Sequence, residues 1–339
     1  MRVSPRRPGM NDVARAAGVS HQTVSRVLND HPNVREETRE KVLAAISELG
    51  YRRNSAARTL VTQRSGTVGV VTTGSFSFGP SQTLVAIEEA AREAGYFLTV
   101  ATLRTVDAQS MRQALGHLMD QGVDGIVVIA PHAEVVDAVR ASHEQLPVVV
   151  VAALADPPES VTTVSVDQAL GARTVVDHLA ALGHAEVVHV SGPPGWLDAE
   201  ARVHGWREQS RALGLTVPAV VEGDWTSACG YAVGRRMVAE GAPTAVFAAN
   251  DHLALGLLRA FHEGGLSVPR DVSVVGFDDV TGAGDFIPPL TTVRPGFADL
   301  GHQIIATLRG LLDGAQVDDA VLEPELVVRE STGRPTGRG

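Results

Sequence analysis

The 339-residue sequence contains a single cysteine, Cys229. Without a second thiol no intrachain disulfide can form, and such cysteine usage is typical of proteins from reducing compartments. Long apolar segments are also absent. The longest run, residues 146–155, contains Pro147 and is about half as long as a membrane-spanning helix. The basic N-terminus is not followed by an apolar stretch, so no secretory signal is predicted. We therefore expect a cytoplasmic protein that makes no contact with a membrane.

Motifs for enzymatic chemistry are missing as well. The chain has no G-x-S-x-G turn, and Gly282-Ala283-Gly284 lacks the third glycine and the preceding strand of a dinucleotide-binding loop. The twelve histidines show no metal-binding spacing. These absences predict a protein that is not an enzyme and that uses neither a cofactor nor a metal ion.

What the sequence does contain is an unequal distribution of charge. Residues 1–65 carry 12 Lys and Arg against 6 Asp and Glu, a net charge of +6. The remaining residues carry 17 against 33, a net charge of −16. A basic head on an acidic body is typical of a nucleic-acid-binding protein, although basic tails also occur in proteins that bind no nucleic acid.

The basic head has the pattern of three short helices. Small apolar residues share one face of the first helix, which Gly18 can end in the left-handed conformation. Ser20 can cap the second helix, and the third covers residues 35–49, with Gly50 after it. The residues expected to point inward are Val13, Ala14, Ala17, Val24, Val27, Leu28, Val42, Leu43, Ile46 and Leu49.

The second helix has a polar outer face that suits DNA. Two helices joined by a short glycine-containing turn form a DNA-reading unit when the second presents such a face. Gln and Arg can pair with base edges, whereas Ser and Thr mostly position the phosphates. The polar residues are His21, Gln22, Thr23, Ser25, Arg26 and Asn29. The alternative is a plain three-helix cap whose polar face is merely solvated.

After residue 65 the pattern changes to short apolar runs that alternate with amphipathic segments. Strands are predicted at residues 68–72, 97–102, 125–130, 148–151, 161–165, 187–190, 245–248 and 272–277. Helices are predicted at residues 81–94, 108–120, 169–182, 199–213 and 251–263. Fully apolar strands that alternate with helices indicate parallel sheets covered on both faces. The number of units favours two doubly wound subdomains with a ligand cleft at the carboxyl ends of the strands.

Polar residues follow several of the predicted strands and suit a sugar ligand. Carboxylates, amides and an arginine can pair with hydroxyl groups, and an aromatic ring can cover the C–H face of a pyranose. The candidates are Arg202, Trp225, Asn250, Asp251, Asp278 and Asp279. Each also has a simpler interpretation, because Asp and Asn at strand ends often cap helices and a Trp is usually part of a core.

Three stretches resemble one family. "DVARAAGVSHQTVSRVLN", "TREKVLAAISELGYRRNSAARTL" and "GFDD" are similar to sequences of the lactose-repressor/galactose-repressor (LacI/GalR) family of bacterial transcription regulators. The resemblance covers residues 10 to about 330. It implies a helix-turn-helix head, a body like the type I periplasmic binding proteins, a homodimer and a small effector. The partners expected are double-stranded operator DNA and a sugar or glycoside.

The resemblance also implies roles for residues of the head. His21 and Gln22 would discriminate operators and Arg26 would contact base edges, whereas Thr23, Ser25 and Asn29 would position the backbone. The segment that follows would be a hinge helix that inserts Leu60 into the minor groove, flanked by Asn54, Ala57 and Arg58. Many relatives have Ser where Arg35 stands, so the cap of the third helix differs here.

In the body, the resemblance assigns the effector to Arg202, Asn250 and Asp278. The segments "GDW" and "IPPLTT" are like those of lactose-repressor-like members, which would place Trp225 and Phe297 against the sugar ring. "GPSQ" matches the same subgroup, so that Thr73 and Ser81 would line the near wall. Where those members have an Asp, this chain has Ala152, and Asp167 is a possible substitute.

Together these patterns predict a sequence-specific transcriptional repressor of a carbohydrate-utilisation operon. Its effector would be a sugar or glycoside, and a galactoside is one candidate. The alternatives are a sugar-binding protein that does not bind DNA and a regulator that responds to a nucleobase.

The chain is expected to divide into five parts. They are a disordered tail (1–9), a DNA-binding domain (10–52), a hinge and linker (53–65), an effector-binding and dimerisation domain (66–330) and a second disordered tail (331–339). Residues 66–165 and 297–325 would form one subdomain and 166–294 the other. Without leucine heptads at the C-terminus, no coiled-coil tetramer is expected.

Overall fold

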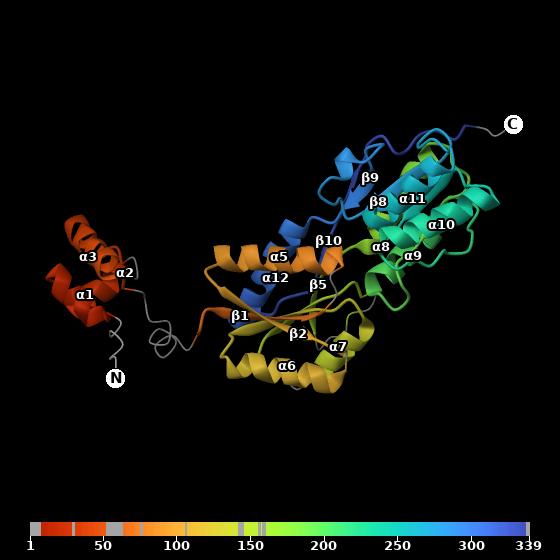
Figure 1. Cartoon of the computed structure of the whole chain (residues 1–339). Coiled ribbons are helices and arrows are strands. Elements are labelled where there is room, and N and C mark those ends of the chain that lie inside the picture. The colour runs from red at the N-terminus through yellow and green to blue at the C-terminus, as the bar shows by residue number, and fades with distance from the viewer. Residues whose placement is uncertain are drawn as a thin grey trace, which may run out of the picture. The chain divides into compact units, whose positions relative to one another are not determined.

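The computed structural model describes residues 8–28, 31–51, 64–74, 77–105, 107–141, 146–154, 157 and 161–336. The chain forms two compact units, Met1–Ser65 and Gly66–Gly339 (Figure 1).

Three helices make up the described part of the N-terminal unit. They are α1 (Met10–Ala17), α2 (His21–Leu28) and α3 (Glu36–Leu49). Gly18 ends α1 with a φ of 67°, a left-handed conformation that suits glycine. The Ser20 hydroxyl caps α2 by accepting the Thr23 N–H at 3.1 Å. Both helix-end predictions are confirmed.

One prediction about the core of this unit is wrong. Leu43 was expected to point inward, but it is 51% exposed, and Ala45 is buried instead. Successive residues of an α-helix are turned by about 100°. Val42, Ala45 and Ile46 therefore share a face, and Leu43 is turned away from it. The hydrophobic core of this unit contains Val13, Ala14, Val24, Val27, Val42, Ala45 and Tyr51.

A six-stranded parallel sheet forms the first half of the body. Its strand order is β10-β5-β4-β3-β1-β2. The strands are β1 (Thr67–Thr73), β2 (Phe97–Leu103), β3 (Gly125–Ile129), β4 (Val148–Val151), β5 (Thr162–Val166) and β10 (Ala320–Leu322). Helices α5 (Phe78–Glu93) and α12 (Phe297–Leu312) cover one face, and α6 (Ala108–Asp120) and α7 (Ala133–Arg140) cover the other (Figure 1). All five residues of β3 are buried, as expected of a strand between two helical layers.

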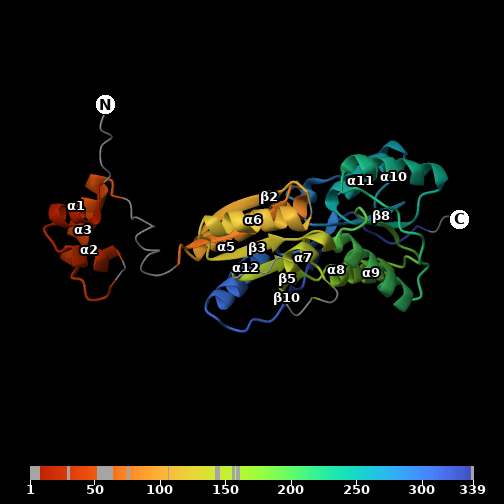
Figure 2. The same cartoon turned by 90° about the horizontal axis from the view of Figure 1, so that it is seen from below.

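A five-stranded sheet forms the second half, in the order β11-β9-β8-β7-β6. The strands are β6 (Val188–Val190), β7 (Ala245–Ala248), β8 (Ser273–Phe277), β9 (Thr291–Arg294) and β11 (Glu325–Val327). Figure 2 shows α10 (Ser227–Glu240) and α11 (Asp251–Glu263) on one face and α8 (Gln168–Ala181) and α9 (Leu197–Ala212) on the other. A short 3-10 helix, η1 (Ala283–Asp285), precedes β9.

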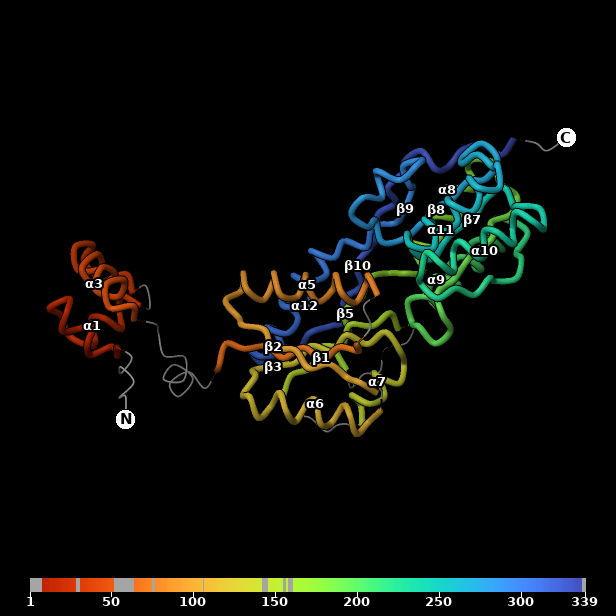
Figure 3. The backbone as a smooth tube through the Cα atoms, in the orientation of Figure 1, coloured from red at the N-terminus to blue at the C-terminus, as the bar shows by residue number. Residues whose placement is uncertain are grey.

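The chain passes between the two sheets after β5, after β9 and after β10, and the backbone tube in Figure 3 follows these passages. The predicted fold class, a helix-turn-helix head on a body of two doubly wound subdomains, is confirmed. The second sheet is not entirely parallel, however, because β11 pairs antiparallel with β9. We call the two halves the six-stranded and the five-stranded subdomain.

The C-terminal segment is ordered further than predicted. Residues 331–339 were expected to be a disordered tail, but Ser331 is completely buried. Its hydroxyl donates to the Val274 carbonyl at 2.6 Å and accepts the Thr291 N–H at 2.8 Å. Because these two bonds satisfy backbone groups of β8 and β9, residues 331–336 belong to the five-stranded subdomain. Residues 337–339 lie outside the described part of the chain.

Helices α10 and α11 pack so closely that glycine is needed between them. A Cβ atom on Gly256 would lie 2.1 Å from the Ser227 carbonyl oxygen and 2.4 Å from the Tyr231 nitrogen. We therefore expect Gly256→Ala to lower the free energy of unfolding by about 1–3 kcal/mol, because the helices must separate. Thermal or urea unfolding measures this change. Gly116→Ala is the matched control, since Gly116 is also helical and a Cβ there meets nothing within 4 Å. Equal stability of the two variants would contradict this account of the packing.

Candidate functional site

The outer face of α2 presents the predicted DNA-contacting residues together. His21, Gln22 and Arg26 are exposed, and Thr23 and Ser25 are half-buried. The opposite face is fixed inward, because Val24 is completely buried and Val27 almost so. Asn29 and the hinge residues Asn54, Ala57, Arg58 and Leu60 lie outside the described residues.

Side-chain hydrogen bonds cap the N-terminal end of α2. The Ser20 and Thr23 hydroxyl groups lie 2.9 Å apart, next to the Ser20 cap described above. Residues His21–Leu28 include Arg26 and no carboxylate. The face therefore offers hydrogen-bond donors, a cation and a helix N-terminus to a polyanion, without a repelling negative charge.

In the body, a cavity of about 50 Å³ lies between the carboxyl ends of the two sheets. We call it the inner pocket. The first turns of α5, the segments after β3 and β4, and the N-terminal end of α12 line it on one side. The first turns of α8 and α9 and the end of β8 line it on the other. Both subdomains therefore contribute to it, as expected for a ligand site at strand carboxyl ends.

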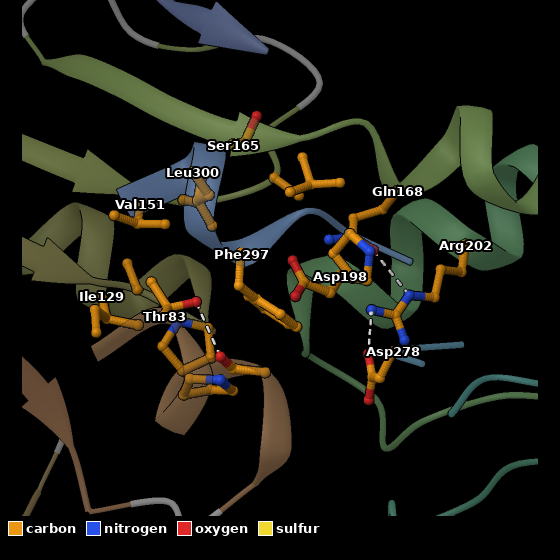
Figure 4. Close-up of a pocket in the computed structure, with 18 residues that line it drawn as sticks. Thr83, Ile129, Val151, Ser165, Gln168, Asp198, Arg202, Asp278, Phe297 and Leu300 are labelled. Carbon is orange, nitrogen blue, oxygen red and sulfur yellow. Dashed lines mark hydrogen bonds and ion pairs between the residues drawn. The ribbon is translucent and has the colours of Figure 1, made fainter. Parts of the chain in front are cut away.

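The two walls of the inner pocket differ in chemistry (Figure 4). The wall from the six-stranded subdomain is mostly apolar and includes Pro80, Ile129, Val151, Phe297 and Leu300. The wall from the five-stranded subdomain is polar and consists of Gln168, Asp198, Arg202 and Asp278. A ligand that fits has hydroxyl or similar polar groups on one side and C–H groups on the other.

Arg202 is the fixed centre of the polar wall. Its side chain is only 5% exposed. Nε donates to Gln168 Oε1 at 2.9 Å, and Nη1 donates to the carbonyl oxygen of Ala249. Its guanidinium carbon lies 3.6 Å from the centre of the Phe277 ring, and Nη2 is 3.7 Å from Asp278 Oδ1. Burial lowers the pKa of Arg202, and the nearby Asp278 carboxylate opposes this shift. Contacts in several directions hold the guanidinium ready for a ligand.

Burial has the opposite effect on the neighbouring carboxyl groups. Desolvation raises the pKa of Asp278 to about 8, although Arg202 opposes the shift. It also raises the pKa of Asp198, again against Arg202. Behind the pocket, desolvation raises the pKa of Asp251 to about 7, while the Thr292 hydroxyl and the Val280 N–H, which both donate to it, lower it. Carboxyl groups of this kind, beside one fixed cation, are typical of functional sites.

The raised pKa of Asp278 predicts a pH-dependent difference in stability. A carboxyl group whose pKa is higher in the folded state favours folding below its unfolded value of 3.8, and this contribution is lost as the pH rises through about 8. Asp278→Asn removes this dependence. We therefore expect the melting temperature of the variant, relative to wild type, to rise from about pH 5 to about pH 8. Differential scanning calorimetry of the two proteins at both pH values measures it. A constant difference would contradict the raised pKa.

Three of the seven body residues predicted to bind the effector line the inner pocket: Arg202, Asp278 and Phe297. Thr73, Ser81, Trp225 and Asn250 are not among its lining residues. Thr73 is buried at the end of β1, and Ser81 is half-buried in the first turns of α5. Contact of these four residues with an effector stays a prediction.

Asn250 and Trp225 have other contacts that explain why they are not among the lining residues. The Asn250 side-chain oxygen accepts the Leu253 N–H at 2.8 Å and so caps α11, while its Nδ2 donates to the Trp225 carbonyl at 3.1 Å. The Trp225 ring lies against Gly192, where a Cβ would be 2.1 Å from the ring. On the polar wall, the guanidinium carbon of Arg202 is 5.6 Å from the centre of the Trp225 ring.

Asp198 and Gln168 are site residues that the sequence analysis missed. Asp167, the possible substitute for the Asp missing at Ala152, instead caps α8 and lies 3.7 Å from Arg173. Asp198 supplies a carboxylate to the inner pocket from a different element, α9. A signal for it was present, because Asp198 and Arg202 are four residues apart and residues at this spacing share a helix face.

The two subdomains also touch at the rim of the inner pocket. The Leu197 N–H donates to the Pro131 carbonyl at 2.9 Å. A ring nitrogen of His132, Nδ1, lies 3.0 Å from the Gly195 carbonyl oxygen, and the His132 and Trp196 rings are 4.9 Å apart. Pro131 lines the pocket and Leu197 precedes Asp198. A ligand that contacts Asp198 therefore binds next to a contact between the subdomains.

Comparison with known families matches both units of the chain. Residues 9–54 match the model of bacterial regulatory proteins of the lacI family, and residues 176–332 match that of a periplasmic binding protein-like domain. The lactose operon repressor of Escherichia coli (strain K12) is 35% identical over 323 residues, which cover 95% of this chain and 89% of that protein. The chain belongs to the LacI family. It is thus a helix-turn-helix transcription regulator.

Other LacI-family members are similarly related. The transcriptional regulator CelR of Thermobifida fusca is 35% identical over 344 residues, covering 96% of this chain and 98% of CelR. A Lac repressor dimer bound to operator and the anti-inducer ONPF superposes with a TM-score of 0.81 at 33% identity, covering 97% of this chain and all of that one. A Lac repressor bound to ONPG in the repressed state has a TM-score of 0.82 at 34% identity, covering 96% of this chain and all of that one. These relatives are repressors or regulators rather than enzymes.

In the ranges that the structure describes, no helix combines the length and apolar character needed to cross a bilayer. Within the same ranges, no group of three or more His, Cys, Asp and Glu side chains is arranged to hold a metal ion.

Proposed function

We propose that this LacI-family repressor is controlled by a neutral sugar bound in the inner pocket. The observation that carries the proposal is the contrast between the two pocket walls. Asp198 and Asp278 can accept hydrogen bonds from sugar hydroxyls, and Arg202 can donate to their oxygens. On the opposite wall, Phe297 offers an aromatic face to the C–H side of the ring.

The chemistry of the pocket favours a sugar over a nucleobase or an anionic ligand. Phe297 is the only aromatic residue among the described residues that line it, so a planar base could stack on one side of the pocket only. Arg202 already donates to Gln168 and Ala249, and a bound anion would make the ionisation of the nearby Asp198 and Asp278 still more costly, so a phosphate or carboxylate ligand is disfavoured. The sugar-bound relatives agree with this assignment, since solved structures show a Lac repressor bound to ONPG and CelR in complex with cellobiose.

For DNA, we assign base contacts to His21, Gln22 and Arg26 on the exposed face of α2. Thr23, Ser25 and Asn29 would position the phosphate backbone. By the family resemblance, Leu60 would enter the minor groove, with Asn54, Ala57 and Arg58 beside it. A dimer of the chain would place two such heads on a near-palindromic operator.

Coupling between the two sites follows from the position of the inner pocket. An effector held by Arg202 and Asp278 on one wall and Phe297 on the other contacts both subdomains. It therefore favours whichever relative arrangement of the subdomains completes these contacts. If operator binding needs one of these arrangements, the sugar shifts the population toward or away from it.

We further propose that the dimer forms through one side of the six-stranded sheet at its β2 edge. Val85 on α5 is 50% exposed, and Val100 on the edge strand β2 is 45% exposed. Leu98, two residues before Val100 and hence on the same face, packs on the core that α5 and α12 cover. The two exposed valines therefore lie on one side of the sheet, where a second copy can bury them.

Val100→Asp is expected to turn the dimer into a monomer, because a carboxylate would be buried in the apolar interface. Sedimentation velocity measures the change. Val321→Asp is the matched control, since Val321 is also exposed, at 61%, but lies on β10 at the opposite edge of the sheet. A Val100→Asp protein that remains dimeric would place the interface elsewhere.

The experiment that tests the sugar assignment is a thermal-shift screen of the full-length protein. The panel contains neutral mono- and disaccharides, sugar phosphates and purine bases. We expect a rise in melting temperature with at least one neutral sugar and none with sugar phosphates, because binding to the native state stabilises it. If the melting temperature rose only with purine bases or only with sugar phosphates, the effector would belong to that class of compound and not to the neutral sugars.

A further inference from the structure

We propose that the effector is a disaccharide or a longer saccharide, and that its second sugar unit occupies a separate cavity beside the inner pocket. This inference rests on the proposed sugar effector. The second cavity, which we call the outer pocket, has a volume of about 480 Å³. It lies between α9, residues 165–169, the end of β4 and Val321 on β10.

The sizes of the two pockets point to a shared ligand. Small-molecule sites are typically about 300–1,000 Å³. The inner pocket, at about 50 Å³, is well below this range, whereas the outer pocket, at about 480 Å³, lies within it. The two pockets adjoin, because Ala153, Ser165, Val166 and Gln168 line both. A sugar ring held at Arg202 therefore has room for a linked ring in the outer pocket.

Helix α9 supplies side chains to both pockets from two different faces. Asp198 and Arg202, one turn apart, line the inner pocket. Leu197, Ala201 and His204 line the outer pocket and follow the spacing of an adjacent face. One rigid helix thus fixes the distance between the two sets of contacts, as a ligand of two linked rings requires.

The outer pocket has the chemistry of a neutral saccharide site. Asp167 and Glu200 provide acceptors, and His204 provides a ring nitrogen. Glu200 also accepts the Gly195 N–H at 3.2 Å, and this contact links it to the rim between the subdomains. The apolar surface comes from Leu197 and Val321, which suit the C–H face of a sugar ring. Among the described residues that line the outer pocket there is no Lys or Arg to pair with the phosphate of a phosphorylated sugar.

Isothermal titration calorimetry of the full-length protein tests this assignment with two pairs of probes, galactose with lactose and glucose with cellobiose. For at least one pair we expect the disaccharide to bind at least about tenfold more tightly than the monosaccharide, with one molecule bound per chain. Ala201→Trp fills the outer pocket and is expected to remove this difference while leaving the monosaccharide affinity within about twofold. Ala212→Trp is the matched control, because Ala212 is exposed at the other end of α9.

Glu200→Gln is the second variant and introduces no bulk. It is expected to weaken the disaccharide alone, whereas Glu240→Gln, an exposed change on α10, is expected to weaken neither ligand. Three results would overturn the outer pocket as a subsite. They are equal affinities for the mono- and disaccharide, two disaccharides bound per chain, and an unchanged disaccharide affinity in both Ala201→Trp and Glu200→Gln. If monosaccharides bind in any of these cases, the proposed control by a sugar still stands. Failure of every sugar to bind wild type would instead overturn the proposed function together with this extension.

Discussion

Asp278→Asn is expected to lose effector binding by about 100-fold while keeping the fold and operator affinity. Above a pH of about 8, where Asp278 is ionised, the variant exchanges a carboxylate that can accept two hydrogen bonds from a sugar for an amide of the same shape. Hydrogen bonds to charged groups contribute about 1.5–3 kcal/mol each, so the loss of one or two is of this size. The neighbouring Arg202 keeps its contacts with Gln168 and Ala249, so the rest of the polar wall stays in place.

Calorimetric titration with the sugar that emerges from the thermal-shift screen measures this loss. Asp137→Asn is the control, because Asp137 is 72% exposed on α7 and is outside both pockets. The melting temperature of the variant, measured at the pH of the titration, shows whether unfolding contributes to a loss of binding. If Asp278→Asn bound the sugar with wild-type affinity, Asp278 would not be an effector-binding residue.

Arg26→Ala is expected to weaken specific operator recognition strongly. Arg26 is exposed on the face of α2 opposite Val24 and Val27, where it can reach a guanine edge with two hydrogen bonds. Loss of such a contact costs about 1–3 kcal/mol. A dimer loses it in both half-sites, so the affinity should fall by about 30-fold at the lower limit and by about 10,000-fold or more at the upper limit.

The measurement is fluorescence anisotropy with a duplex selected from a random library by the wild-type protein, compared with an unrelated duplex. Arg26→Ala should weaken the selected duplex far more than the unrelated one. The control, Arg15→Ala, removes a positive charge from α1 whose side chain is 82% exposed, and should weaken both duplexes to a similar, small extent. An equal loss on both duplexes in Arg26→Ala would make Arg26 a phosphate contact rather than a base contact.

The parts of the fold that sequence patterns predict best are those in which local and tertiary preferences agree. The apolar runs that became β4 and β7 and the amphipathic segments that became α6 and α11 were predicted with the observed bounds. The strands β10 and β11 have three residues each and no fully buried position, so no apolar pattern in the sequence predicts them. They exist because neighbouring strands offer backbone partners, which is a tertiary property.

The candidate site shows the same division. Asp278 and Arg202 could be placed because one follows a strand and both belong to recognisable motifs. Asn250 also follows a strand, but its amide is used to cap α11 and to bind the Trp225 carbonyl, and the sequence alone does not distinguish these uses. Asp198 was missed because its four-residue spacing from Arg202 indicates a shared helix face but does not tell that this face meets the ends of the strands.

The central claim is that a sugar in the inner pocket controls the affinity of the α2 heads for DNA. The most direct test is the operator affinity of the full-length protein, measured by anisotropy with and without saturating effector, for wild type and Asp278→Asn. The account predicts a change of about 5–150-fold in wild type, the usual range for allosteric coupling, and no change in the variant at the same sugar concentration. An operator affinity that stays the same when calorimetry shows the wild-type protein saturated with sugar would contradict it.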